Sequence, residues 1–263
     1  MAVEMLSLAR HRHLRWHRYD GYAFAASHNL VGLAAAELSR AALALPLTFV
    51  EQGGGWSLCA LLGLASGQNL YVTPDGRWIA SYIPATLRAY PFHLGWEGMN
   101  ATLSLDEGSR LLAADGFGEP IFDEAGDLSE PVRQVWSFLS ATAESILVLE
   151  AACRVLADAG VIVPWPLTIY GSEGTQAVSG LNQIDEAALN ALDDAAFSKL
   201  RQAGVLSVAY AQLLSMGNLA DLGKLAQARA EADASARAKA EVKPMMMLPD
   251  DSTIDWDWSK VGR

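Results

Sequence analysis

Apolar positions along the chain follow two different periods, one in each half. In the first half, short runs rich in β-branched and aromatic residues are separated by glycine, proline and other turn-forming residues, which is typical of antiparallel strands. Residues 129–159 change to a helical period, with Ser129 at the cap, Pro131 in the first turn and Gly160 just past the end. The sequence therefore predicts an α+β fold, whose antiparallel β-rich amino-terminal half packs on helices of the carboxy-terminal half. The predicted strands are residues 46–50, 56–64, 69–73, 77–83 and 101–105.

Residues 71–83 contain the clearest turn signal. Pro74 presets its backbone angle, Asp75 can accept hydrogen bonds from nearby amides, and Gly76 tolerates a positive φ. These residues predict an antiparallel hairpin that turns at 74–76. We further expect Trp78 or Tyr82 to pack on the long helix.

Beyond the long helix, the sequence predicts a short β run at residues 166–171 and two or three more helices, one of which ends near Gly204. The composition then changes to alanine and charged residues, so residues 227–263 are interpreted as a helical extension with an acidic tail. In that tail Trp256 and Trp258 alternate with aspartates. An extended chain places both indoles on one face. This arrangement suits a segment that is ordered against a protein surface, either folded back on its own chain or exchanged between subunits.

Net charge and composition exclude several classes of protein. The formal net charge is -11 and the isoelectric point is about 4.8, so attraction to nucleic acid or anionic lipid is unfavourable. No uninterrupted run of about 18 apolar residues is present to span a membrane, and no apolar signal stretch precedes the small residues at 23–25. We therefore expect a cytoplasmic protein with no nucleic-acid partner and no membrane span. The two cysteines, Cys59 and Cys153, lie in apolar runs, which argues against a disulfide scaffold.

A basic segment at residues 10–18 stands apart from this acidic background. It contains four arginines and no acidic residue. Residues 1–20 are therefore interpreted as a basic amino-terminal arm, which docks on the acidic body, on a partner or on a membrane surface. The arm also carries His11, His13 and His17. Because the interleaved arginines repel a cation, we expect no metal there.

Few residues have the pattern of a catalytic site. No nucleophile elbow, phosphate-binding loop or dinucleotide motif is present, so no catalytic residue and no cofactor is assigned. His93 is a candidate general base, which needs Asp106 or Glu107 within hydrogen-bond reach; a histidine beside aromatic residues is more often structural. Aromatic residues are candidates for ligand binding instead, and these are Trp78, Tyr82, Tyr90 and Phe92, with Trp256 and Trp258 of the tail.

Several sequence blocks recur in the order and spacing of one bacterial family. The blocks are GYAFAASHNLVGLAAAELSRAALALPLTFV, WSLCALLGLASGQNLYVTPDGRWIASYIPATLRAYPFHL, ATLSLDEGSRLL, EPIFDEAGDLSEPV and LNQIDEAALNALDDAAFSKLRQAGVLSVAYAQLLSMGNLADL. They resemble the SapC family over roughly residues 21–225. The resemblance implies one SapC-like domain at residues 21–226, a link to bacterial surface layers through the family's name, and genomic neighbourhoods with flavin-dependent halogenases. It carries over no catalytic residue.

These observations lead to three hypotheses of function. The first is a non-catalytic protein- or peptide-binding and scaffolding protein, which has a protein or peptide partner or self-associates through the tail. The second is an enzyme or enzyme accessory that acts on a peptide or aromatic substrate, in company with a flavin-dependent halogenase. The third is a structural protein of a surface layer, which would act at the cell surface. A concave site that joins His93, Asp106 or Glu107 to aromatic residues favours an enzyme, whereas a groove or flat apolar patch favours a scaffold.

Overall fold

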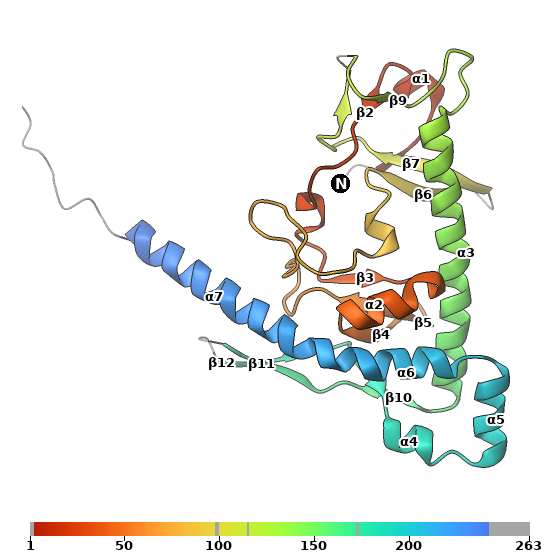
Figure 1. Cartoon of the computed structure of the whole chain (residues 1–263), viewed down its shortest axis with the longest axis vertical. Coiled ribbons are helices and arrows are strands. Elements are labelled where there is room, and N and C mark those ends of the chain that lie inside the picture. The colour runs from red at the N-terminus through yellow and green to blue at the C-terminus, as the bar shows by residue number, and fades with distance from the viewer. Residues whose placement is uncertain (1–2, 98–99, 115, 172–173, 242–263) are drawn as a thin grey trace, which may run out of the picture. The chain divides into compact units, whose positions relative to one another are not determined.

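Helix α3, Glu130–Asp158, confirms the helical pattern of the sequence (Figure 1). Ser129 stands at the amino-terminal cap position, where its hydroxyl donates a hydrogen bond to the carbonyl oxygen of Pro120 at 2.6 Å. Pro131 lies in the first turn, where its missing N–H needs no partner. Gly160 follows the end with a φ of +71°, the left-handed conformation that commonly terminates helices. The helix begins and ends within one residue of the predicted bounds.

The computed structural model describes residues 3–97, 100–114, 116–171 and 174–241, in two units, residues 1–226 and 227–263. The predicted tail motif at Trp256 and Trp258 lies outside the described residues. No single described helix is long and apolar enough to cross a membrane, although one bent pair of helices meets that test jointly. Besides α3, the helices are α1 (Leu8–His11), α2 (Leu38–Ala44), α4 (Glu186–Asn190), α5 (Asp194–Gln202), α6 (Leu206–Ser215) and α7 (Leu219–Glu241), with 3-10 turns η1 (Ala23–Ala25), η2 (Ala35–Glu37), η3 (Ala85–Leu87) and η4 (Met216–Asn218).

Within the described residues the strands pair antiparallel throughout, as the sequence predicts. The sheet orders are β10-β13-β4-β5-β3, β1-β7-β6, β8-β2-β9 and β11-β12. Together with the helices these sheets confirm the α+β class. The strands are β1 (Val3–Met5), β2 (Arg15–Trp16), β3 (Leu30–Gly32), β4 (Leu47–Gln52), β5 (Gly55–Leu61), β6 (Phe92–Glu97), β7 (Asn100–Asp106), β8 (Leu112–Ala113), β9 (Glu119–Pro120), β10 (Ile162–Pro164), β11 (Leu167–Gly171), β12 (Gly174–Val178) and β13 (Asn182–Ile184).

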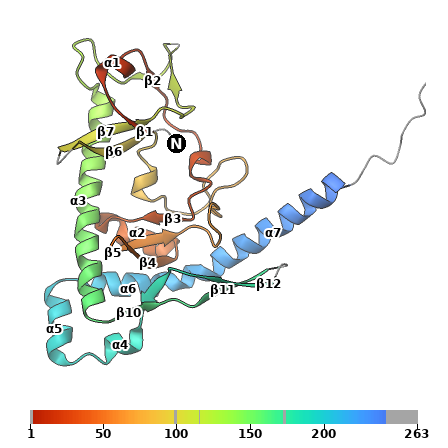
Figure 2. The same cartoon turned by 180° about the vertical axis from the view of Figure 1, so that it is seen from behind.

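Two separate hydrophobic cores share helix α3. Toward its carboxy-terminal end, buried Leu149 and Leu156 belong to the larger core, which fills the space around the five-stranded sheet. Toward its amino-terminal end, Val132 and Leu139 belong to a smaller core that also contains Phe92 of β6. The helix contacts β5 and β6 accordingly, and in Figure 2 it runs beside both sheets. It therefore holds two independently packed parts of the unit at a fixed spacing.

The predicted hairpin at residues 71–83 forms its turn but not its strands. Gly76 has a φ of +84° and its N–H donates to the carbonyl oxygen of Thr73 at 2.8 Å, which confirms the turn at 74–76. Only one isolated bridge, between Val72 and Trp78, follows from it, so the strands predicted at 69–73 and 77–83 are wrong. A side chain bonds the backbone across this turn, because the Thr73 hydroxyl accepts a hydrogen bond from the Arg77 N–H at 3.0 Å.

The basic segment at residues 10–18 lies on the unit that contains both cores. Strand β1 pairs with β7, and β2 pairs with β8 and β9. His11 and Trp16 are buried, whereas Arg10 and Arg18 form exposed ion pairs with glutamates. The segment thus contributes strand β2 and the core residue Trp16 to the fold, in addition to positive charge.

Replacing Gly76 with alanine should lower the free energy of unfolding by about 1 kcal/mol, because an alanine at positive φ is strained. The added Cβ would also contact the Cβ of Ala23 at 3.4 Å. The matched control is Gly217→Ala in η4, where a Cβ meets no atom within 4 Å. Urea unfolding monitored by tryptophan fluorescence gives both values. Equal midpoints for the two variants would contradict the turn.

Candidate functional site

Four aromatic residues singled out in the sequence take different positions in the structure. Trp78 packs against the larger core and lies 6.0 Å from the ring of Tyr71. Phe92 is fully buried and meets Trp16 edge to face at 5.1 Å. Tyr82 and Tyr90 each line a cavity. Trp78 and Phe92 therefore support the fold, whereas the side chains of Tyr82 and Tyr90 lie at cavity walls, where a ligand could contact them.

Asp106 and Glu107 are adjacent in sequence but form separate contacts. Asp106, at the end of β7, accepts hydrogen bonds from the Tyr90 hydroxyl at 3.2 Å and from the Gly108 N–H at 3.1 Å. Glu107 contacts the buried ring of His11 at 3.0 Å and forms an ion pair with Arg10 at 2.8 Å. The carboxylates of Asp106 and Glu107 therefore do not act together at this strand end.

His93 shares a cavity wall with Tyr90, but it is not bonded to either candidate acid. Its Nε2 is buried and has no hydrogen-bond partner among the described residues. Burial lowers the pKa of His93, and the nearby Asp106 carboxylate only partly opposes that effect. His93 is therefore a neutral imidazole in a cavity of about 280 Å³, which is also lined by Phe24, His28 and Tyr90.

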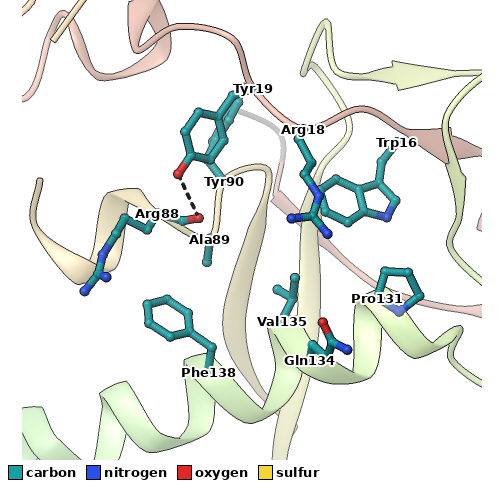
Figure 3. A pocket seen from close by; sticks show the side chains of 10 residues that line it. All are labelled: Trp16, Arg18, Tyr19, Arg88, Ala89, Tyr90, Pro131, Gln134, Val135 and Phe138. Carbon is teal, nitrogen blue, oxygen red and sulfur yellow. Dashed lines mark hydrogen bonds between the residues drawn. The ribbon is translucent and has the colours of Figure 1, made fainter.

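A cavity with a volume of about 460 Å³ lies along the amino-terminal half of α3. We call it the arginine cavity (Figure 3). One wall is the chain that follows β2, another is the chain that follows η3, and the floor is one face of α3. It is lined by Trp16, Arg18, Tyr19, Arg88, Ala89, Tyr90, Pro131, Gln134, Val135 and Phe138.

The walls of the arginine cavity are held in place by contacts from three parts of the chain. The Tyr19 hydroxyl donates a hydrogen bond to the carbonyl oxygen of Arg88 at 3.3 Å, which joins the first two walls (Figure 3). The ring of Tyr90 stacks on Phe24 at 3.9 Å between centroids. The α3 residues on the floor recur at helical spacing, so one stripe of the helix faces the cavity.

Two arginines give the cavity its positive charge. The Arg88 guanidinium lies 5.2 Å from the ring centroid of Phe138 and 5.9 Å from that of Tyr82, within the range of a cation–π interaction. Arg18 pairs with Glu119 at 3.3 Å, and both side chains are exposed. No carboxylate lines this cavity among the described residues. A ligand would therefore meet two guanidinium groups and four aromatic rings.

Two smaller cavities adjoin the arginine cavity through shared walls. A cavity of about 200 Å³ has Arg88 and Phe138 in common with it, and adds Glu37, Arg40 and Tyr82. The His93 cavity has Tyr90 in common with it. The three cavities therefore follow the chain of residues 82–93 in a row, and two of them also lie beside α3.

Glu37 positions the chain that leads to Arg88. Its buried carboxylate accepts three hydrogen bonds, from the Ala34 N–H at 2.8 Å, the Tyr82 hydroxyl at 2.7 Å and the Ala85 N–H at 2.7 Å. It thereby ties η2 to the start of η3. The only sequence signal for this role is an acidic residue within the apolar run of residues 30–50.

Neither metal ligands nor reactive thiols gather at these cavities. No group of three or more His, Cys, Asp or Glu side chains could hold a metal ion among the described residues. Burial raises the pKa of Cys59 to about 11 and that of Cys153 to about 12. Both thiols are therefore protonated and unreactive at neutral pH.

The fold and its cavities define an α+β protein with a basic, aromatic cavity on an acidic chain. The family model of SapC matches residues 6–222, so the chain belongs to the SapC family. No curated protein and no solved structure matches it.

Removing the Glu37 carboxylate should strongly destabilise the fold. In Glu37→Ala three donors lose their acceptor, and we expect a loss of about 3 kcal/mol. Tyr82→Phe removes only one of these donors and should cost about 1 kcal/mol. Glu144→Ala, at an exposed position on α3, is the control. Urea midpoints should fall in the order control, Tyr82→Phe, Glu37→Ala, and a different order would refute the role of Glu37.

Alkaline pH should also weaken the fold through Tyr71 and Tyr82. Burial raises the pKa of each phenol to about 12, whereas a tyrosine in the unfolded chain ionises near 10. Their stabilising contribution is therefore complete below pH 10 and is lost as the pH rises toward 12. Tyr82→Phe should reduce the fall in urea midpoint between pH 9 and pH 11, and Tyr210→Phe should not. Equal falls in both variants would contradict the assignment.

Proposed function

We propose that this SapC-family protein is a non-catalytic binding protein, whose arginine cavity takes a segment of a partner protein that carries carboxylates and aromatic side chains. The observation that carries the proposal is the composition of the cavity, with two arginines, four aromatic rings and no acidic residue on its described lining. The chain as a whole has a net charge of -11. The cavity is a local positive exception on an acidic protein, and the surrounding negative charge repels anionic partners that do not fit the cavity.

The chemistry of the lining specifies the ligand. Guanidinium groups bind carboxylates through paired N–H donors, so Arg18 and Arg88 favour a ligand that carries acidic groups. Tyr90, Phe138 and Trp16 offer ring faces and edges that bury aromatic or large apolar side chains. The Tyr90 hydroxyl donates its hydrogen bond to Asp106, and its oxygen can accept one from an N–H of the ligand. An acidic-aromatic segment satisfies all three kinds of group at once.

The row of cavities favours a chain-like ligand over a compact one. A cavity of about 460 Å³ holds one large side chain with its flanking groups, and the adjoining cavities add about 200 Å³ and 280 Å³. Shared walls at Arg88, Phe138 and Tyr90 connect the three. An extended peptide fills such a row with successive side chains.

The second candidate function is an enzyme or an enzyme accessory that acts on an aromatic substrate. It is favoured by the neutral imidazole of His93 beside Tyr90 in a cavity. A general base of this kind needs an orienting acid, and Asp106 instead accepts hydrogen bonds from Tyr90 and Gly108. Binding without catalysis is therefore the preferred proposal. A role in a surface layer would use the same binding site for assembly.

Calorimetric titration tests the proposal with the probe peptide acetyl-Glu-Phe-Gly-Glu-Phe-amide. The parent protein should bind it, and binding should weaken as salt screens the charges. Arg18→Gln and Arg88→Gln should each weaken binding about fivefold, or about 1 kcal/mol, as for a partly exposed ion pair. The control Arg201→Gln, at an exposed position on α5, should bind like the parent.

Two further peptides separate charge from hydrophobicity. A version with lysine in place of glutamate should not bind, and a version with serine in place of phenylalanine should bind much more weakly. Equal binding of all three peptides, or loss of binding in Arg201→Gln as well as Arg88→Gln, would refute the arginine cavity as the site.

A further inference from the structure

The chain carries a segment with the chemistry that the arginine cavity selects. Asp255, Trp256, Asp257 and Trp258 alternate two carboxylates with two indoles. In an extended conformation the carboxylates lie on one side of the backbone and the indoles on the other. Of the acidic stretches in the sequence, this one contains two tryptophans within three residues. These residues lie outside the described part of the structure, so they are compared with the cavity by their sequence alone.

Charge and shape requirements of the cavity match this segment group by group. The two aspartates match Arg18 and Arg88 in number and are opposite to them in charge. An indole would pack against the rings of Phe138 and Tyr90, and its N–H is a donor as well as an apolar surface. Side chains two positions apart along an extended chain are separated by about 7 Å. Adjoining cavities that share a wall can receive two such side chains from one strand.

We infer that residues 252–258 of a second copy of the chain occupy the arginine cavity. This inference rests on the proposed function and names a ligand for the same cavity. Each copy has one cavity and one segment, so two copies that exchange segments satisfy both sites in a closed dimer. Along the chain the segment follows α7, a helix of 23 residues. Such a helix is about 34 Å long, and ten more residues, 242–251, precede the segment, so the segment has the length of chain needed to reach a second copy.

The first experiment measures self-association of the full chain by sedimentation equilibrium across a range of protein concentrations. The parent should form a dimer that dissociates on dilution and in 0.5 M NaCl. The double variant Trp256→Ser with Trp258→Ser, and separately the double variant Arg18→Gln with Arg88→Gln, should each dissociate at concentrations at least tenfold higher. The control Met246→Ser, outside the acidic-aromatic segment, should associate like the parent. A parent that stays monomeric at every concentration would overturn the inference.

Mixing the two double variants gives the sharper test. The tryptophan variant keeps an intact cavity and the arginine variant keeps an intact segment, so one intermolecular contact remains possible only in the mixture. We expect mixed dimers that neither variant forms alone. If no mixed dimer forms, or if both variants associate as strongly as the parent, a second copy is not the occupant.

A titration separates failure of this inference from failure of the proposed function. The synthetic peptide of residues 252–263 should bind the tryptophan variant and should not bind the arginine variant. If the glutamate-phenylalanine peptide binds the cavity but the peptide of residues 252–263 does not, self-recognition is wrong and the general binding function stands. If neither peptide binds, both proposals fail.

Discussion

One helix shared by two separate cores is the constraint on which the rest of the structure depends. Leu149 and Leu156 anchor α3 in the larger core, and Val132 and Leu139 anchor it in the smaller one. Between these anchors the helix crosses a seam where neither core fills the space. The cavity of about 200 Å³ lies at this seam, whereas the arginine cavity lies beside the smaller core, and Phe138 lines both. The site is therefore a consequence of how the helix is buried at both ends.

The two arginines of the arginine cavity are held in position by contacts with distant parts of the sequence. Arg18 is placed by the pairing of β2 with β8 and β9. Arg88 is placed by η3, whose start is fixed by the buried carboxylate of Glu37. A buried carboxylate with three donors is stable only when each hydrogen bond is made. The hydrogen bonds of Glu37 thus fix the backbone that leads to Arg88 at the wall of the cavity.

Regular elements with strong local signals could be predicted from the sequence. Helix α3 was predicted to within one residue at each end because its cap residues and its period agree. Strands β4, β5 and β7 matched the predicted runs at 46–50, 56–64 and 101–105. The runs at 69–73 and 77–83 are also rich in strand-forming residues, but there the Thr73 side chain bonds the backbone of Arg77 and only one isolated bridge forms. Propensity alone does not reveal that competition.

The site was less accessible to sequence reasoning, because its residues converge only in the folded chain. Among the predicted aromatic residues, Tyr90 lines the cavity, whereas Phe92, two positions later in the chain, is buried in the core. Glu107 contacts His11, nearly a hundred residues away, and this pairing has no local signal. In the sequence, Arg18 belongs to a basic segment that indicates no cavity, and Arg88 is a single arginine among aromatic residues.

The most direct test of the central claim is a crystal structure of the protein grown with the glutamate-phenylalanine peptide. The account predicts peptide density in the arginine cavity, with carboxylates within hydrogen-bond distance of Arg18 and Arg88 and a phenyl ring against Phe138. Peptide density elsewhere on the molecule, with the arginine cavity empty, would contradict it.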